Sequence, residues 1–150
     1  MTTIIDFHNI VIHLIELLET LIAIEKDKLE AVTSKDFDTL NSCIKNEQVL
    51  VLKLKGLDKK REQVLSNLGY DGLSYKEIIA RLPAEQKEES SKLFTALQQA
   101  TDEFHTINNS VKTALDVNLH VINTTLSKLG INPEIEQVIS SGSHLKNRFA

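Results

Sequence analysis

Residues 4–32 read IIDFHNIVIHLIELLETLIAIEKDKLEAV, and the spacing of polar residues in this stretch decides the fold class. Polar or small residues recur at alternating steps of three and four, which places them along one side of an α-helix. These residues are Asp6, Asn9, His13, Glu16, Thr20, Ala23, Asp27 and Glu30. Apolar residues cover the other half of the circumference, and an arc this wide predicts packing against two neighbours. We expect one long helix in a helical core.

The same stretch is apolar enough to raise the question of a membrane. It has no basic leader and no small-residue cleavage site, so it does not resemble a secretory signal. A spanning helix of about 20 residues would also bury several polar side chains at high cost. They include Asp6, His8, Asn9, His13, Glu16 and Glu19. We therefore expect a soluble cytoplasmic protein without stable membrane insertion.

A second long helix is predicted over residues 36–68. The polar residues 33–36 break the chain, and Ser34 or Asp36 can cap the helix that follows. Apolar residues and one glutamate then form a seam with the spacing of helix-to-helix packing. The seam consists of Leu40, Ile44, Glu47, Val51 and Leu54, with Cys43, Leu50, Leu57, Val64 and Leu68 beside it. The short connection makes the two helices antiparallel neighbours, and Cys43 is expected to be a small buried hydrophobe.

Glycine and proline mark the remaining helix ends. Gly69 suits the left-handed position after the second helix, and residues 74–77 (SYKE) match a capping box that opens a short helix. Pro83 at a first helical position begins the last and longest helix, which we expect to end at Leu129 with Gly130 as its stop.

The last helix carries a heptad seam whose apolar surface widens toward its end. The seam residues are Leu97, Ala100, Phe104, Ile107, Val111, Ala114, Asn118 and Val121. Beyond residue 114 they are joined by Leu115, Leu119, Ile122, Leu126 and Leu129. The first two helices should span about 45 Å each and the last about 70 Å. If Pro83 lies level with the end of the second helix, the stretch from Lys112 to Leu129 projects beyond its partners, and exposed apolar surface of that size predicts a binding site.

The predicted fold is therefore all-α. It is an elongated antiparallel hairpin or bundle of three long helices and one short helix over residues 1–130, followed by a tail over residues 131–150. In the tail, Ile135, Val138 and Ile139 share one face of a possible short helix. Three apolar residues cannot bury enough surface to fold alone. The tail is either a frayed end or a segment that orders on a partner.

Motifs for chemistry are missing from the sequence, so we expect neither catalytic residues nor cofactor or metal sites. His8 and His13 are five residues apart and do not share a helix face, and no histidine has the His-Glu-x-x-His zinc pattern. Net charge is −4, which does not favour nucleic-acid binding. A basic cluster (Lys53, Lys55, Lys59, Lys60 and Arg61) is interrupted by Asp58 and Glu62, which favours a solvated face over an anionic docking patch.

Three features together resemble the FlgN family of flagellar export chaperones. The first is the helical segment SKDFDTLNSCIKNEQVLVLKLKGLDKKREQVLSNLG at residues 34–69. The second is the long proline-started helix after a short intervening segment. The third is the asparagine-bearing end of that helix, INNSVKTALDVNLHVINTTLSKLG, at residues 107–130. The resemblance covers most of residues 4–130 and is one of pattern rather than of a single motif.

This resemblance implies a cytosolic chaperone without enzymatic activity. It implies binding to the C-terminal helical regions of hook–filament junction proteins, protection from premature assembly and delivery to the type III export apparatus. The family binds its substrates through its C-terminal part. Carried onto this chain, the predicted partner-binding residues are Leu115, Asn118, Leu119, Ile122, Leu126, Leu129, Ile135, Val138 and Ile139.

A generic coiled-coil scaffold or tethering subunit is the alternative reading. A chaperone is expected to be a monomer or weak homodimer that binds an isolated partner helix reversibly. A scaffold is expected to be a stable oligomer when purified alone.

Overall fold

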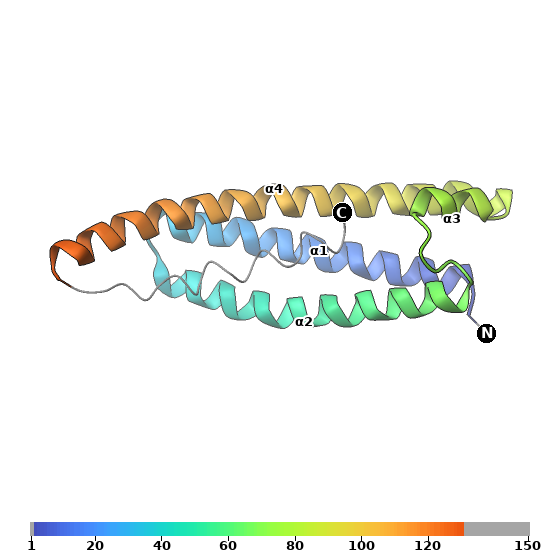
Figure 1. Ribbon diagram of the computed structural model, residues 1–150, viewed down its shortest axis with the longest axis horizontal. Coiled ribbons are helices and arrows are strands. Elements are labelled where there is room, and N and C mark those ends of the chain that lie inside the picture. Colours follow the sequence, from blue (N-terminus) through green and yellow to red (C-terminus); the bar gives the residue numbers. More distant parts are fainter. Residues whose placement is uncertain (1, 131–150) are drawn as a thin grey trace. The chain divides into compact units, whose positions relative to one another are not determined.

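A computed structural model describes residues 2–130, which form four α-helices with no strand in that range (Figure 1). The helices are α1 (Ile4–Thr33), α2 (Phe37–Asn67), α3 (Tyr75–Arg81) and α4 (Ala84–Lys128). The all-α prediction of three long helices and one short helix is confirmed, and the ends of the long helices lie within one residue of their predicted positions. The tail, with Ile135, Val138 and Ile139, lies outside the described residues.

The turn between α1 and α2 is closed by backbone hydrogen bonds. Lys35 takes a left-handed conformation (φ 58°), and the N–H of Asp36 donates to the carbonyl of Ala31 at 2.9 Å. The Asp36 carboxylate then accepts a bond from the backbone N–H of Thr39 at 3.2 Å. Of the two predicted caps, Asp36 is therefore the one that caps α2. Its two hydrogen bonds with Thr39 lower the pKa of the Asp36 carboxyl.

The connection from α2 to α4 uses the predicted glycine and cap. Gly69 has φ 78°, and the N–H of Tyr70 donates to the carbonyl of Leu65, which satisfies a carbonyl at the end of α2. Ser74 Oγ accepts from the N–H of Glu77 at 3.2 Å and caps α3. These local signals place α3 where the sequence predicted it.

Helix α1 is amphipathic as predicted. Every residue of the predicted solvent stripe is exposed, whereas Phe7, Val11 and Leu14 are fully buried. By length and composition alone α1 could cross a membrane, and a buried core helix passes the same test. In this protein the apolar side of α1 is covered by protein, which is the environment of a core helix.

The described residues divide into two compact units, and α1, α2 and α4 each contribute to both. The first, here called the aromatic unit, comprises residues 2–21 and 48–102. The second, here called the charged unit, comprises residues 22–47 and 103–130. Each unit has its own core, and the two cores are of different chemical kinds.

In the aromatic unit, three rings join α1, α3 and α4. Tyr75 stacks on Phe94 with centroids 4.5 Å apart, and Phe7 meets Phe94 edge to face at 5.7 Å. Burial raises the pKa of the Tyr75 hydroxyl. A buried polar contact adds to this core, because His8 Nε2 lies 2.6 Å from Ser90 Oγ. Neither the ring cluster nor the His8–Ser90 contact was predicted from the sequence.

In the charged unit, Lys28 lies between two buried carboxylates. Its Nζ is 3.1 Å from Glu25 Oε1 and 2.6 Å from Glu47 Oε2, and Asn108 Nδ2 donates to Glu25 Oε2 at 3.2 Å. Burial raises the pKa of Glu25 above its ordinary value, and the neighbouring Glu47 charge acts in the same direction against the effect of Lys28. The pKa of Lys28 is also raised, because the two carboxylates together outweigh the desolvation that opposes them.

An apolar cluster completes the charged unit next to the α1–α2 turn. Ala31, Val32 and Leu40 are buried there, and Ile44, Ala114 and Leu115 pack against them. Cys43 is buried in the same unit, and burial raises the pKa of its thiol. The prediction that Cys43 is a small buried hydrophobe is confirmed.

Candidate partner-binding site

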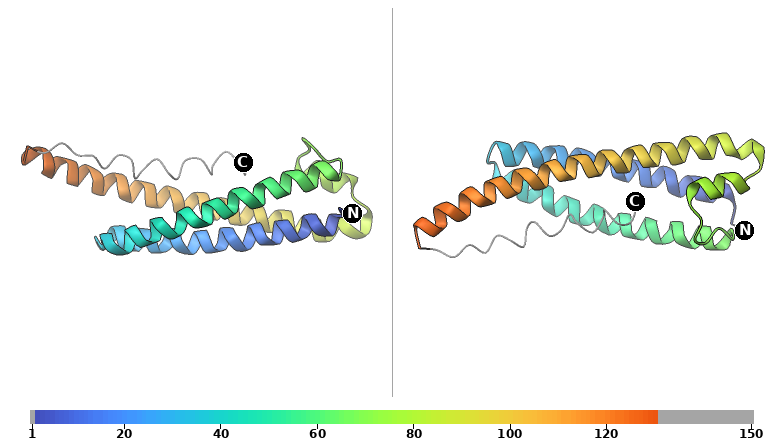
Figure 2. Two further views of the ribbon diagram at one scale, coloured as in Figure 1. Left: turned by 90° about the horizontal axis from the view of Figure 1, so that it is seen from below. Right: turned by 45° about the horizontal axis from the view of Figure 1, so that its top comes forward.

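Asn118 joins α4 to the end of α1. Its Nδ2 donates to the carbonyl of Ala114 at 3.0 Å and lies 3.5 Å from the carbonyl of Val32, in the last turn of α1. Beyond this point α4 continues past the α1–α2 turn, as its orange-red end shows in Figure 1 and in both views of Figure 2. We call residues 119–128 the α4 extension. Ten helical residues span about 15 Å.

The projecting part of α4 is shorter than the sequence predicted. It was expected to start at Lys112, but Val111 is buried, and Ala114 and Leu115 pack against the cluster of Ala31, Val32 and Leu40. The prediction assumed that Pro83 lies level with the end of α2, and that assumption set the register of α4. In the structure the register follows the contacts of Ala114, Leu115 and Asn118 instead, so the extension begins after Asn118.

Aliphatic side chains are exposed on both sides of this point. Val117 is 60% exposed, Val121 is 55% exposed, and Leu129, just after the helix, is 68% exposed. Val121 belongs to the heptad seam and to the stretch that the sequence predicted to project, and its exposure agrees with that expectation. Leu119 is half-buried. Exposed aliphatic residues at a helix end can accept the apolar stripe of a partner helix.

The predicted binding residues fall into three groups. Leu115 and Asn118 contact the charged unit and form the base of the extension. Leu119, Ile122, Leu126 and Leu129 belong to the extension or follow it directly, and for Ile122 and Leu126 only the backbone is described. The remaining three, Ile135, Val138 and Ile139, lie outside the described residues.

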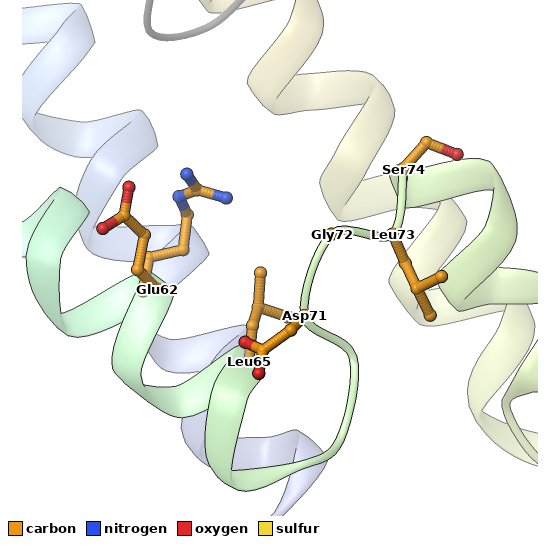
Figure 3. Close-up of a pocket in the computed structure, with 7 residues that line it drawn as sticks. Glu62, Leu65, Asp71, Gly72, Leu73 and Ser74 are labelled. Carbon is orange, nitrogen blue, oxygen red and sulfur yellow. The ribbon is translucent and has the colours of Figure 1, made fainter.

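Two pockets lined by described residues lie away from the α4 extension. A pocket of about 480 Å³ in the aromatic unit lies between the end of α2 and its connection to α3, where Glu62, Leu65 and Asp71 line it (Figure 3). A second pocket, of about 290 Å³, lies beside the α1–α2 turn in the charged unit. Within residues 2–130, His, Cys, Asp and Glu side chains do not gather in groups of three that could hold a metal ion.

The buried ion pairs of Glu25, Lys28 and Glu47 were not predicted from the sequence. Glu25 and Lys28 do not belong to the solvent stripe of α1, and they follow Leu21 and precede Val32 at core spacing. Glu47 stands in the predicted seam of α2. These positions were a usable signal, because a charged residue at a core position needs a buried partner of opposite charge.

Comparison with known proteins agrees with this architecture. The family model described as FlgN protein matches residues 1–135, which include all four helices. No curated protein and no solved structure gives a significant match. FlgN proteins are soluble cytosolic chaperones of flagellar assembly. Because the match covers most of the sequence, the chain belongs to the FlgN family of flagellar export chaperones.

Proposed function

We propose that this chaperone binds the C-terminal helical regions of hook–filament junction proteins, keeps them from assembling prematurely and delivers them for export. The observation that carries the proposal is the α4 extension. It continues past the α1–α2 turn, with Val121 exposed on it and Leu129 exposed immediately after the helix. The family identity supports binding to flagellar proteins in general.

Recognition follows from the amphipathic character of a helix. A partner helix lays its apolar stripe along Leu119, Ile122 and Leu129, whose spacing of three and seven places them on one side of a helix. Water then leaves the apolar surfaces of both helices. The tail residues Ile135, Val138 and Ile139 then add to the same surface, and residues 131–150 become ordered on the partner. A junction protein held in this way cannot use the same apolar stripe for assembly.

The test measures binding of a peptide from the C-terminal helical region of a junction protein of the same organism, by isothermal titration calorimetry. Leu119→Asp and Ile122→Asp should each weaken binding by at least tenfold, because a charge would enter an apolar interface. Ser127→Asp, at an exposed position of the extension, is the matched control and should bind normally.

Circular dichroism and thermal melting decide whether the loss of binding is specific. We expect helicity and melting temperature to stay nearly unchanged in all three variants. If Leu119→Asp unfolds the protein, the segment is part of the core and the proposal fails. Sedimentation velocity addresses the scaffold alternative, because a stable oligomer of the purified chain would contradict a chaperone that is a monomer or weak dimer.

A further inference from the structure

The outer face of α2 differs from what its sequence suggested. Asp58 was expected to interrupt the basic cluster, but it is only 3% exposed, and Arg61 Nε lies 3.1 Å from its Oδ1. Both side chains are largely withdrawn from solvent, and their charges offset each other. Asp58 therefore leaves the outer face of the helix to the lysines.

The remaining surface combines positive charge with exposed aliphatic residues. Lys53, Lys55, Lys59 and Lys60 are all exposed. Val49 is 55% exposed and Leu52, one helical turn later, is 68% exposed. Five of the 17 Lys and Arg residues of this acidic chain lie in the range 53–61, where Asp58 is the one acidic residue; Glu62, the other interrupting acid, follows directly and is exposed. We call Val49, Leu52, Gly56 and these four lysines the α2 face.

Gly56 is the second, independent observation. It lies inside α2, where glycine is one of the least favourable residues for helix formation. A β-carbon at this position would meet no atom within 4 Å, so the packing of this protein does not require a glycine there. A glycine on an exposed helix face allows another backbone to approach closely. The position is one turn after Leu52 and one turn before Lys60.

We propose that the α2 face is a second docking surface, and that its occupant is an acidic amphipathic helix of a partner protein that crosses α2 at Gly56. Carboxylates of this helix pair with the lysines on either side of Gly56, and its apolar stripe covers Val49 and Leu52. The surface belongs to the aromatic unit, whereas the α4 extension belongs to the charged unit. The chaperone thus has separate surfaces for two partners.

Two other classes of ligand fit the α2 face less well. A membrane-surface helix usually presents a broad apolar side with bulky residues, and this face offers only Val49 and Leu52. Single-stranded nucleic acid is bound by aromatic side chains interleaved with positive charge, and residues 49–60 contain no aromatic residue. A partner helix that crosses α2 closely also accounts for the glycine at position 56.

The experiment uses the full chain and a fluorescein-labelled 20-residue peptide with Leu at helical three-four spacing and Glu at most other positions. Fluorescence anisotropy measures its affinity. Lys53→Glu with Lys60→Glu should weaken binding at least tenfold. Lys76→Glu with Lys87→Glu is the control, because it changes net charge equally at exposed positions outside the α2 face, and it should change affinity less than twofold.

Two further variants test whether the peptide crosses α2 at Gly56 and whether its binding is independent of the α4 extension. Gly56→Leu should weaken peptide binding at least tenfold while helicity is kept or increased, because the side chain fills the approach. Leu119→Asp should leave binding of this peptide unchanged. The proposal for the α2 face can therefore fail without the proposal for the α4 extension failing, and the reverse also holds.

Each of the following results overturns the proposal. The peptide does not bind, the control pair weakens it as much as the lysine pair, Gly56→Leu has no effect, or a peptide with Ser in place of Leu binds equally well. Binding of the chain to phosphatidylserine vesicles without binding of the peptide, or self-association through the α2 face, would also overturn it.

Discussion

The aromatic unit and the charged unit hold the same three long helices together by different physics. In the aromatic unit, Phe7, Tyr75 and Phe94 pack ring to ring, and burial of their apolar surfaces is less directional than an ion pair. In the charged unit, Lys28 must meet Glu25 and Glu47 at hydrogen-bonding distance. A buried ion pair that loses one partner is far costlier than an imperfect apolar contact. Directional contacts therefore set the register of the charged unit.

This difference bears on the α4 extension. Asn108 donates to Glu25, and Asn118 lies within reach of the carbonyl of Val32, so two polar contacts align α4 with α1. A shift of α4 by one turn would break both contacts. The length of helix that projects beyond the α1–α2 turn is thus determined by residues in the charged unit.

Among variants that distinguish the two units, Lys28→Met is expected to lower the free energy of unfolding most. Met keeps a similar length but leaves the buried carboxylates of Glu25 and Glu47 without a counter-charge, and removal of one partner from a buried ion pair costs about 3–5 kcal/mol. Urea unfolding followed by circular dichroism measures the loss. Lys26→Met is the matched control, because Lys26 is exposed and lies 3.6 Å from an exposed Glu103. It should cost less than about 1 kcal/mol. Equal effects of the two variants would show that the buried cluster is not what stabilises the charged unit.

The sequence predicted the helices well because their signals are local. The spacing of polar residues in α1, the cap at Asp36 and the left-handed Gly69 each depend on residues within a few positions of one another. Register and buried pairing depend on contacts between helices. The Glu25–Asn108 bond joins residues 83 positions apart, and His8–Ser90 joins residues 82 apart. Periodicity within one helix carries no information on such pairs, so the start of the α4 extension was predicted too early.

An intermediate effect is expected in the aromatic unit from Ser90→Ala. Ser90 is fully buried and His8 is 5% exposed, so the variant leaves the His8 ring nitrogen without its partner and away from water. An unsatisfied buried polar group costs about 1–3 kcal/mol. Ser91→Ala, at the neighbouring exposed position, should change the free energy of unfolding by less than about 0.5 kcal/mol. If Ser90→Ala is as mild as Ser91→Ala, apolar packing alone sustains this unit.

The smallest effect, and the one with a distinctive pH dependence, is expected from Glu25→Gln. Because burial raises the pKa of Glu25 in the folded protein, the folded state binds this proton more tightly than the unfolded chain does. The contribution of Glu25 to stability is therefore fully present below its ordinary pKa of 4.5 and is lost as pH rises through the raised value. Gln cannot titrate and keeps hydrogen-bonding groups at the same place, so the change should stay below about 1.5 kcal/mol.

Melting temperatures of both proteins between pH 4 and pH 7 test this sign. Relative to wild type, Glu25→Gln should gain stability as the pH rises, since only the wild type then carries the extra buried charge. Lys28 stays charged throughout this interval, because its pKa is raised above 10.5, so it does not contribute to the difference. A variant that instead loses stability relative to wild type toward pH 7 would mean that the attraction of Lys28 exceeds the cost of burying Glu25. In that case the charged unit would be stabilised by its ion pairs as well as aligned by them.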